Sequence, residues 1–324
     1  MIPDPARYAK DAADAIGAVF TDLDDGGGYL FRISKNGRSV VAGAGGVSSF
    51  PVNSATAFTL SRDKSHTKSV LRSVGVPVIG GKLFFAHTLR AGLRGPGREI
   101  EDARAFAREL GYPVFAKPNQ GSQGNFAEII DGDAALLDYA RRVAGEFESF
   151  LIEPLIRGSE HRVLIQDGRA VFHVRKQAPG LTGDGRRSAA ALLDALNMEL
   201  QGTGVSPYPV SVLGAAGIDA SSVPLEGQRI VLPGRRNLSA VGEIETFSDA
   251  TPPVLHDLAA RSVAALGLRI GAVDMFDLSS DDDLGELVVI EVNGNPGLRT
   301  LELAGRMDLI RGVWVSMLNE YLGD

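Results

Sequence analysis

The stretch LVVIEVNGNPGL, residues 287–298, places an acid and two amides directly after four apolar residues. An unbroken apolar run predicts a buried strand, and the Asn, Gly and Pro residues that follow predict that the chain then turns away. Glu291 and Asn293 lie two positions apart, so alternation along a strand puts both side chains on one face. Because such groups are not buried without partners, this strand end is either a polar turn at a sheet edge or a site that holds a ligand.

A second apolar strand carries an acid of the same kind. GAVDMF, residues 271–276, contains Asp274, and the short acidic turn between the two strands predicts that they are antiparallel neighbours. Two carboxylates and an amide oxygen at one spot would form an all-oxygen site, which suits Mg²⁺ or Mn²⁺ bound together with phosphate oxygens. The alternative is a turn cluster with Asp274 paired to an arginine, the commoner arrangement for an isolated Asp–Glu pair. The Gly and Pro spacing after Asn293 favours the metal site, because it holds the chain in a fixed path just beyond the ligands.

Composition narrows the class of protein. The chain has 324 residues, 44% of them hydrophobic, and a net charge of −7, which is enough for two or three packed layers and too apolar for disorder. We expect no membrane segment, because no apolar run approaches the roughly 18 residues that span a bilayer, and no signal peptide. The absence of cysteine excludes disulfides, thiolate zinc sites and a cysteine nucleophile, so a cytoplasmic location is expected. The acidic balance gives no electrostatic reason to expect nucleic acid.

Arginine supplies most of the positive charge, and lysines are few. Because lysine is a compact charge and a common phosphate partner, each lysine is a candidate phosphate ligand. Lys117 ends a short apolar strand and precedes NQGSQGN, residues 119–125. A lysine before a glycine-rich loop can present its ammonium and backbone N–H groups to phosphates; the alternative is an ordinary surface lysine. The segment before Lys82 is not a Walker loop, and no G-x-G-x-x-G follows a strand, so a dinucleotide Rossmann site has no support.

The segment FLIEPLIRGSEHRV, residues 150–163, carries Glu153 and Glu160 around a Pro and a Gly. A strand, a kinked connector and a second strand can form a hinge whose backbone bonds the edge of an adenine ring. Glu153 could then accept from an exocyclic amine, and Glu160 from ribose hydroxyls. Either acid alone is more often a solvated charge.

The remaining pattern predicts an α+β layout. We expect helices near residues 6–16, 61–75, 99–110, 133–147, 252–268 and 311–321, with Ser61 as the cap of the second. An Asn-Gly turn predicts a hairpin across residues 29–43, and Asp167-Gly168 predicts another. Residues 178–250 are expected to be rich in loops.

In this order the motifs resemble the ATP-grasp carboxylate–amine ligases, closest to the ATP-grasp portion of cyanophycin synthetases and bifunctional glutathione synthetases, with D-alanine–D-alanine ligase more distant. The resemblance covers about residues 60–300 and rests on DKSHTKSVLRSVGVPV, FAKPNQGSQGN, LIEPLIRGSEHRVLIQDGRAV, RKQAPGLTGDGRRS, GRRNLSAVGE, GAVDMFDL and IEVNGNPGLR. Each motif alone is weak, but the ordered set is specific. It implies an ATP-grasp fold that holds the nucleotide between two α+β subdomains. The implied division is a short N-terminal lobe at 1–60, a subdomain with the phosphate loop at 61–150, and a subdomain with the adenine hinge and metal site at 151–324.

The resemblance also implies roles for particular residues. Lys68 and Lys117 would contact the ATP phosphates, and the loop of Gly121, Ser122, Gln123 and Gly124 would close over them. Glu153, the Leu155 backbone and Glu160 would hold adenosine, and Arg175 or Lys176 would touch the phosphates or the adenine. Asp274, Glu291 and Asn293 would ligate Mg²⁺, and Arg235 or Arg236 with Asn237 would face an acyl-phosphate.

The implied activity is an ATP-dependent ligase that forms an amide or peptide bond through an acyl-phosphate and releases ADP and phosphate. Its partners would be small-molecule carboxylate and amine substrates, such as amino acids or small peptides, and the family suggests a homodimer. The alternatives are phosphorylation without ligation, a nucleotide-binding regulator with a degenerate site, and a structural protein without a ligand. The sequence does not identify either substrate.

Overall fold

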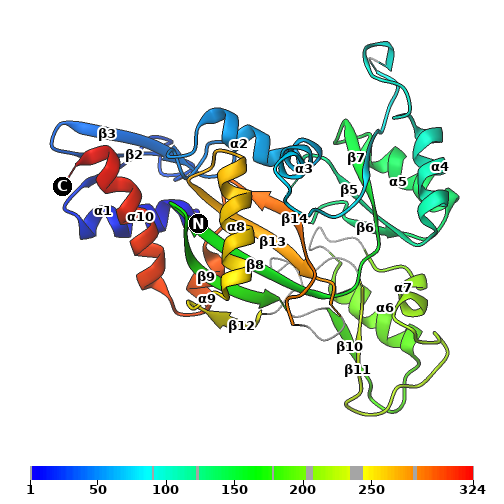
Figure 1. Cartoon of the computed structure of the whole chain (residues 1–324). Helices are drawn as coiled ribbons and strands as arrows, with labels where there is room; N and C mark the ends of the chain where they lie inside the picture. The colour runs from blue at the N-terminus through cyan, green and yellow to red at the C-terminus, as the bar shows by residue number, and fades with distance from the viewer. Residues whose placement is uncertain are drawn as a thin grey trace.

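The computed structural model describes residues 2–89, 91–121, 124–176, 179–201, 207–233, 244–279 and 283–323. The described strands form four sheets, and the largest, a five-stranded antiparallel sheet in the order β12-β9-β8-β13-β14, lies at the centre of the molecule (Figure 1). Its strands are β8 (Ser159–Gln166), β9 (Arg169–Lys176), β12 (Ile244–Ser248), β13 (Ile270–Asp277) and β14 (Leu287–Asn293). None of the helices in these ranges is both long and apolar enough to cross a membrane.

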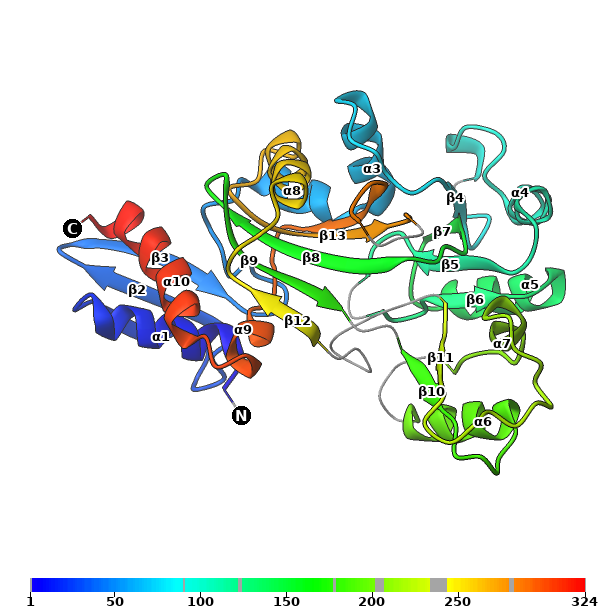
Figure 2. The ribbon, with the colours of Figure 1, turned by 60° about the horizontal axis from the view of Figure 1, so that its bottom comes forward.

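Both faces of the central sheet are covered, which explains why every residue of β13 is buried. The helix α8 (Pro253–Ala265) lies across one face, where Val163 and Val273 pack with it (Figure 2). The opposite face contributes Leu164 and Ala272 to the core of the N-terminal lobe. A strand buried on both sides cannot alternate between apolar and polar residues, so β13 carries a nearly continuous apolar run.

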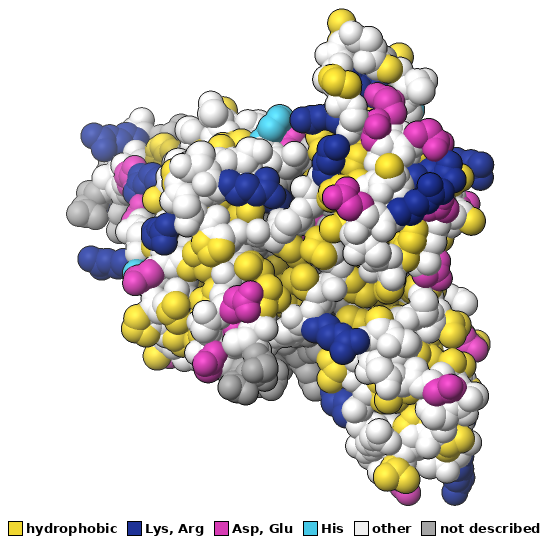
Figure 3. Space-filling view, turned by 45° about the vertical axis from the view of Figure 1, so that its right-hand side comes forward, with side chains coloured by type: hydrophobic (Ala, Val, Ile, Leu, Met, Phe, Trp, Pro, Cys, Tyr) yellow, Lys and Arg dark blue, Asp and Glu magenta, His cyan; other side chains and the backbone are white. Residues whose placement is uncertain are grey.

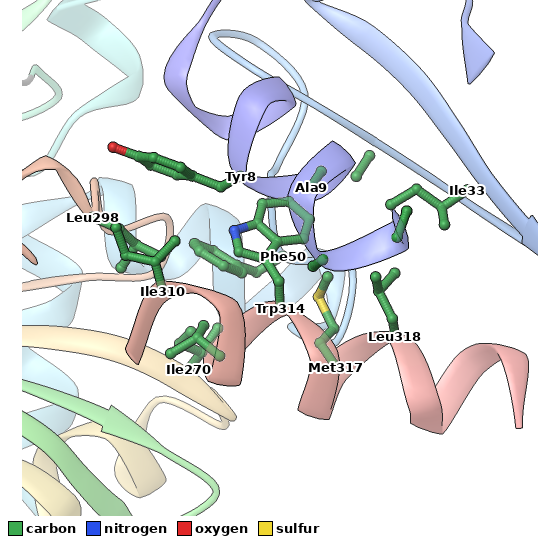
Figure 4. Close-up of a cluster of buried hydrophobic side chains, with 14 of the residues drawn as sticks. Tyr8, Ala9, Ile33, Phe50, Ile270, Leu298, Ile310, Trp314, Met317 and Leu318 are labelled. Atoms are coloured by element: carbon green, nitrogen blue, oxygen red, sulfur yellow. The ribbon is translucent and has the colours of Figure 1, made fainter. Parts of the chain in front are cut away.

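The N-terminal lobe combines both ends of the chain. Its elements are α1 (Asp4–Ala15), the antiparallel strands β1 (Val19–Asp22), β2 (Leu30–Lys35) and β3 (Arg38–Gly43), and the C-terminal helices α9 (Arg299–Leu303) and α10 (Met307–Leu322). Trp314 of α10 is fully buried, with its ring centroid 5.5 Å from that of Phe50 (Figure 4). The N-terminal helix and strands therefore share one core with α9 and α10 from the other end of the chain, and the three-part division of the chain stays a prediction.

The predicted hairpins are confirmed. Asn36 and Gly37 join β2 to β3 with φ of 52° and 74°, and Asp167 and Gly168 join β8 to β9 with φ of 49° and 77°. Two successive residues with positive φ match the right-handed twist of the flanking strands, and Asn-Gly or Asp-Gly adopts this conformation at low cost.

A second sheet has the order β4-β7-β5-β6 and lies beside the central one. Its strands are β4 (Lys82–Phe85), β5 (Val114–Pro118), β6 (Glu128–Ile130) and β7 (Ser149–Pro154). The helices α4 (Ile100–Leu110) and α5 (Asp133–Val143) cover one face, and the short η1 (Ala91–Leu93) lies in the preceding loop. The other face carries the side chains of the candidate site.

The predicted helix cap at Ser61 is wrong. Ser61 lies inside α2 (Ala55–Arg62), and α3 (Lys64–Ser73) is capped by Asp63, whose carboxylate accepts a hydrogen bond from His66 N at 2.9 Å. An N-cap needs extended backbone, and Asp63 has it, with φ −98° and ψ 101°.

Between residues 178 and 250, where the sequence predicts many loops, the structure also contains short regular elements. This stretch contains β10 (Gly180–Thr182), α6 (Ala189–Glu199), α7 (Ser211–Ala215) and β11 (Arg229–Val231), which we call the small lobe. Leu181, Leu193, Val212 and Ile230 form its core. The sequence of α6 is apolar around most of its circumference, so it lacks the spacing by which an amphipathic helix is detected.

Candidate functional site

Strand pairing brings the two predicted acids together. Asp274 of β13 lies directly opposite Glu291 of β14, which confirms the predicted antiparallel arrangement. The amide nitrogen of Asn293 donates to Asp274 Oδ2 at 3.3 Å and to Glu291 Oε1 at 3.2 Å. Directly opposed residues and residues two apart share a face of a sheet. Three oxygen-bearing side chains therefore converge on one face of the central sheet.

Asp274 also has cationic neighbours. It is 2% exposed, and its Oδ2 accepts from Arg162 Nη1 at 2.8 Å, while Lys176 Nζ lies 2.8 Å from Oδ1. The pairing of Asp274 with an arginine, which we weighed as the alternative, is thus present together with the convergence of acids. Oδ1 nevertheless lacks a well-aligned hydrogen bond within the described residues, because the lysine contact is an ion pair only. Arg162 was missed from the sequence, although its position two residues after Glu160 places both on one face.

Of the two basic residues at the end of β9, Lys176 belongs to this cluster. It is buried, forms a close ion pair with Glu160, and contacts Asp274. Burial opposes its charge most strongly, but Asp274 and Glu160 hold the pKa of Lys176 above its usual value. Arg175 lies opposite His161 in the β8–β9 register, on the other side of the sheet.

A second buried cluster joins the three predicted residues Lys68, Lys117 and Glu153. They are 3%, 6% and 1% exposed. Glu153 accepts from Lys68 through Oε1, and its Oε2 lies 3.0 Å from Lys117 Nζ. Burial opposes ionisation of Glu153, but the two ammonium groups hold its pKa below the usual range, and burial lowers the pKa of Lys68 to about 8. One carboxylate shared by two lysines leaves a positive charge in a buried place, which favours binding of an anion.

Lys64 is a further residue at the site that sequence reasoning missed. Its Nζ donates to Gly121 O at 2.9 Å, and the first turn of α3 is tied to the same loop by Ser65 N, which donates to Asn119 Oδ1 at 2.9 Å. Burial lowers the pKa of Lys64 despite the attraction of Glu291. Conversely, although burial of Glu291 acts against its charge, Lys64 and Lys117 hold its pKa at about 2. The spacing of Lys64 and Lys68, one helical turn apart, was the signal available in the sequence.

Only some of the other predicted site residues lie in the part of the chain that the structure describes. The connector between β7 and β8 contains Leu155, whose side chain packs against the core of the small lobe. Gly121 and Gly124 lie in the loop between β5 and β6, and Gly124 has a φ of 74°. Ser122, Gln123, Arg235, Arg236 and Asn237 lie outside the described residues.

The donor set suits a hard divalent cation. Asp274 and Glu291 supply carboxylates, Asp274 Oδ1 is buried without an aligned donor, and Asn293 can turn its amide oxygen toward a metal. In the described ranges no group of three or more His, Cys, Asp or Glu side chains has the spacing of a metal site. An ion here would therefore take its remaining ligands from water or phosphate, as Mg²⁺ does when it binds through one or two carboxylates.

Known proteins resemble this chain both in sequence and in fold. No family model matches the chain. A cyanophycin synthetase from Nostoc sp. is 30% identical over 257 residues, which is 74% of this chain and 27% of that protein. A glutathione biosynthesis bifunctional protein from Desulfotalea psychrophila is 26% identical over 251 residues, covering 73% of this chain and 31% of the relative. The chain thus spans less than a third of the length of these relatives.

The crystal structure of a bifunctional glutathione synthetase from Pasteurella multocida superposes with a TM-score of 0.54 at 19% identity. The match covers 98% of this chain and 44% of that one, so it extends over the N-terminal lobe as well as the central and second sheets. The chain is thus similar in sequence to part of these two relatives, and it has the ATP-grasp fold.

Proposed function

We propose that the chain is an ATP-dependent carboxylate–amine ligase that forms an amide or peptide bond. The observation that carries this proposal is the pair of adjacent buried clusters. Lys68, Lys117 and Glu153 leave a positive charge facing the acids Asp274 and Glu291. A site with a cationic half and an oxygen-donor half suits a nucleotide triphosphate bound with a divalent cation.

Nucleotide binding would exchange the partners of the buried lysines. Glu153 now pairs with Lys68 and Lys117, and Glu160 pairs with Lys176. If the lysines turn to phosphate oxygens, Glu153 can accept from the adenine amine and Glu160 from ribose hydroxyls, with Leu155 offering its backbone. The buried charges would thus stay compensated when the nucleotide binds.

Asp274, Glu291 and Asn293 would hold Mg²⁺ or Mn²⁺, as their oxygen donors fit these ions. When bound, the ion would neutralise charge on the phosphate oxygens. The ammonium group of Lys64 contacts the glycine loop at Gly121 O and interacts with Glu291. It could therefore bind the phosphates when the loop closes over them. The residues of this chain would thus supply charge neutralisation and positioning, which are the main requirements of phosphoryl transfer.

The reaction would proceed in two steps. The substrate carboxylate takes the γ-phosphoryl group of ATP, so that ADP leaves and an acyl-phosphate forms. An amine then attacks the acyl carbon, loses a proton, and phosphate departs with the C–O electron pair. Arg235 or Arg236 with Asn237 would stabilise the oxyanion of the second step. Closure of the loop from Gly121 to Gly124 would keep water from the acyl-phosphate.

Two relatives support amino acids or small peptides as substrates, since one is named a cyanophycin synthetase and another a glutathione biosynthesis protein. The cytoplasmic location and the homodimer stay predictions.

The test is a phosphate-release screen of the full chain with MgATP against a matrix of amino acids and dipeptides, with mass spectrometry of the products. We expect phosphate release that needs both a carboxylate and an amine, and a product lighter by one water than their sum. The variant Lys117→Met should be inactive, and Lys10→Met, on the exposed face of α1, should match the wild type. A phosphorylated product that forms without an amine would instead support a kinase. Tight ATP binding without turnover in any mixture would support a regulator.

A further inference from the structure

Asn119 is a buried polar residue at the start of the glycine loop, directly after β5, and it is 4% exposed. Its backbone N–H donates to Ser149 O at 3.0 Å, which extends the pairing of β5 with β7 by one residue. Side chains two positions apart on a strand share a face. The side chain of Asn119 therefore lies on the same face as Lys117, which is the face of the candidate site.

Two oxygens of Asn119 hold the first turn of α3. Lys64 N donates to Asn119 O at 3.2 Å, and Ser65 N donates to Asn119 Oδ1 at 2.9 Å. The next N–H group, of His66, donates to the capping carboxylate of Asp63. These are donors that the first turn of a helix otherwise leaves unpaired. Because they are already paired, an anion near this end of α3 must be bound by side chains.

The contact with α3 fixes which way the side-chain amide of Asn119 faces. A backbone N–H can only donate, so the atom that meets Ser65 N is the amide oxygen. The nitrogen Nδ2 is on the other branch of the amide, and its two N–H groups make no hydrogen bond with the described part of the chain. Buried polar groups are nearly always hydrogen-bonded. An unpaired donor on this face therefore indicates a partner that the chain itself does not supply.

The charges around Asn119 identify that partner as an anion. Lys117 is two residues away on the same face, and Lys64 Nζ lies 2.9 Å from Gly121 O, at the next turn of the loop. Lys68 lies one helical turn after Lys64 and belongs to the same buried cluster as Lys117. An amide donor among three lysines suits a phosphate group, whose oxygens accept several hydrogen bonds at once.

Burial strengthens this attraction. Lys68 and Lys117 are buried, and on the face shown in Figure 3 hydrophobic side chains gather where the small lobe meets the rest of the molecule. Charges away from solvent are screened less than charges on the surface. A phosphate that reaches Asn119 would therefore interact strongly with the lysines beside it.

We propose that Asn119 holds α3 through Oδ1 and binds a phosphate group of the nucleotide through Nδ2. The inference rests on the proposed function, because it concerns the same nucleotide site. Asparagine suits both roles, since ionised aspartate offers only acceptors and leucine offers neither donor nor acceptor. Asn119 would thus fix the phosphate relative to α3, the helix that carries Lys64 and Lys68.

The test compares Asn119→Asp with Asn125→Asp in the full chain, by calorimetric titration with ADP and Mg²⁺. Aspartate keeps the acceptor for Ser65 N near the N-terminus of a helix, so the melting temperature of Asn119→Asp should not fall. We expect its affinity for ADP to fall by roughly tenfold or more, because a donor to phosphate is lost and a negative charge takes its place. Asn125 is exposed in the same loop, so the same change of charge there should alter the affinity by no more than about twofold.

A second measurement separates a direct contact from a general effect of charge. In NMR spectra of the protein with isotope-labelled asparagine, the side-chain amide signal of Asn119 is the one that is missing from the spectrum of Asn119→Ser. This signal should move when ADP and Mg²⁺ are added and stay in place with adenosine alone. A residue that only supports α3 would not respond in this way.

Unchanged affinity in Asn119→Asp, an equal loss in Asn125→Asp, or an amide signal that ADP and Mg²⁺ leave in place would each overturn the proposal. A signal that moves equally with adenosine would also overturn it, because the contact would then be to the nucleoside. None of these measurements needs turnover. A failed ligase screen beside the expected binding results would count against the ligase activity alone, and normal turnover by Asn119→Asp with unchanged ADP affinity would count against this inference alone.

Discussion

Asp274 and Glu291 stand opposite each other on β13 and β14, and one amide nitrogen, from Asn293, lies 3.3 Å from an oxygen of the first and 3.2 Å from an oxygen of the second. Two carboxylates this close repel each other unless cations compensate them. Here Arg162 and Lys176 compensate Asp274, and Lys64 and Lys117 act on Glu291. The cations around Glu291 lower its pKa and favour its ionised form, which is the state that binds a divalent cation.

Glu291→Gln should abolish turnover while the fold persists. The amide keeps the shape of the side chain but removes the charge that would hold the metal and its phosphates. We expect ADP release to fall by about 10²-fold or more, with a modest change in the free energy of unfolding. Glu286→Gln, at the exposed start of the same hairpin, is the control and should behave as wild type. Normal ADP release by the Glu291 variant would refute the metal assignment.

Lys64→Met should weaken binding of ADP with Mg²⁺ by roughly tenfold or more, because a charge-assisted contact to phosphate contributes about 1.5–3 kcal/mol. The same change should raise the pKa of Glu291, since Lys64 is the main charge that lowers it. Calorimetric titration of the variant beside Lys10→Met measures the effect. Equal affinities in the two variants would show that Lys64 serves only the loop around Gly121.

Glu153→Gln should destabilise the protein strongly. It leaves the ammonium groups of Lys68 and Lys117 buried without a carboxylate, and removal of one partner from a buried ion pair costs roughly 3–5 kcal/mol. Urea unfolding, with the exposed Glu146→Gln as the matched control, measures the difference. A loss below 1 kcal/mol, far under the roughly 3–5 kcal/mol expected, would mean that water reaches the lysines.

Asn53 ties the N-terminal lobe to the strands that carry the acids. Its Nδ2 donates to Ile270 O and Gly294 O at 2.8 Å, and its Oδ1 accepts from Arg269 N at 2.8 Å and from Ile270 N at 3.1 Å. Asn53→Leu leaves four backbone groups without this partner and should cost about 3–4 kcal/mol at roughly 1 kcal/mol each. Asn53→Asp retains the acceptor and should cost less. Equal urea midpoints for Leu, Asp and wild type would contradict this role.

The stability of the protein should depend on His173 in mildly acidic solution. His173 is buried, its Nε2 lies 2.9 Å from His161 Nδ1, and burial lowers its pKa. As the pH falls, His173 is therefore protonated in the unfolded protein at a higher pH than in the folded protein. Its contribution to the free energy of unfolding is complete above the unfolded pKa of about 6.5 and decreases as the pH falls below that value. One such group contributes a slope of at most about 1.4 kcal/mol per pH unit.

The measurement is urea unfolding at several values from pH 7.5 to 5.5 for wild type and His173→Gln. We expect the variant to be less stable than wild type at pH 7.5, because the substitution removes the contact with His161. Its free energy of unfolding should decrease less steeply toward pH 5.5. Parallel pH profiles for the two proteins would assign the decline to other groups.

Most of the strands could be predicted because their signals are local. The turns at Asn36-Gly37 and Asp167-Gly168 set φ by residue type, and the antiparallel pairing of β13 and β14 followed from two apolar runs joined by a short acidic turn. The helices α2 and α6 were missed because their sequences lack a clear helix signal of their own. One directly precedes another helix with only Asp63 between them, and the other is apolar around most of its surface.

The sequence by itself determined which chemical groups are present and which strands carry them, since alternation and turn chemistry depend on neighbours along the chain. Tertiary structure alone decided that Trp314 completes the N-terminal lobe, that Lys176 rather than Arg175 meets Asp274, and that one carboxylate, Glu153, serves two lysines from different elements. Such contacts depend on how whole sheets and helices pack, because partners far apart in the chain meet only when the hydrophobic faces beneath them have been buried.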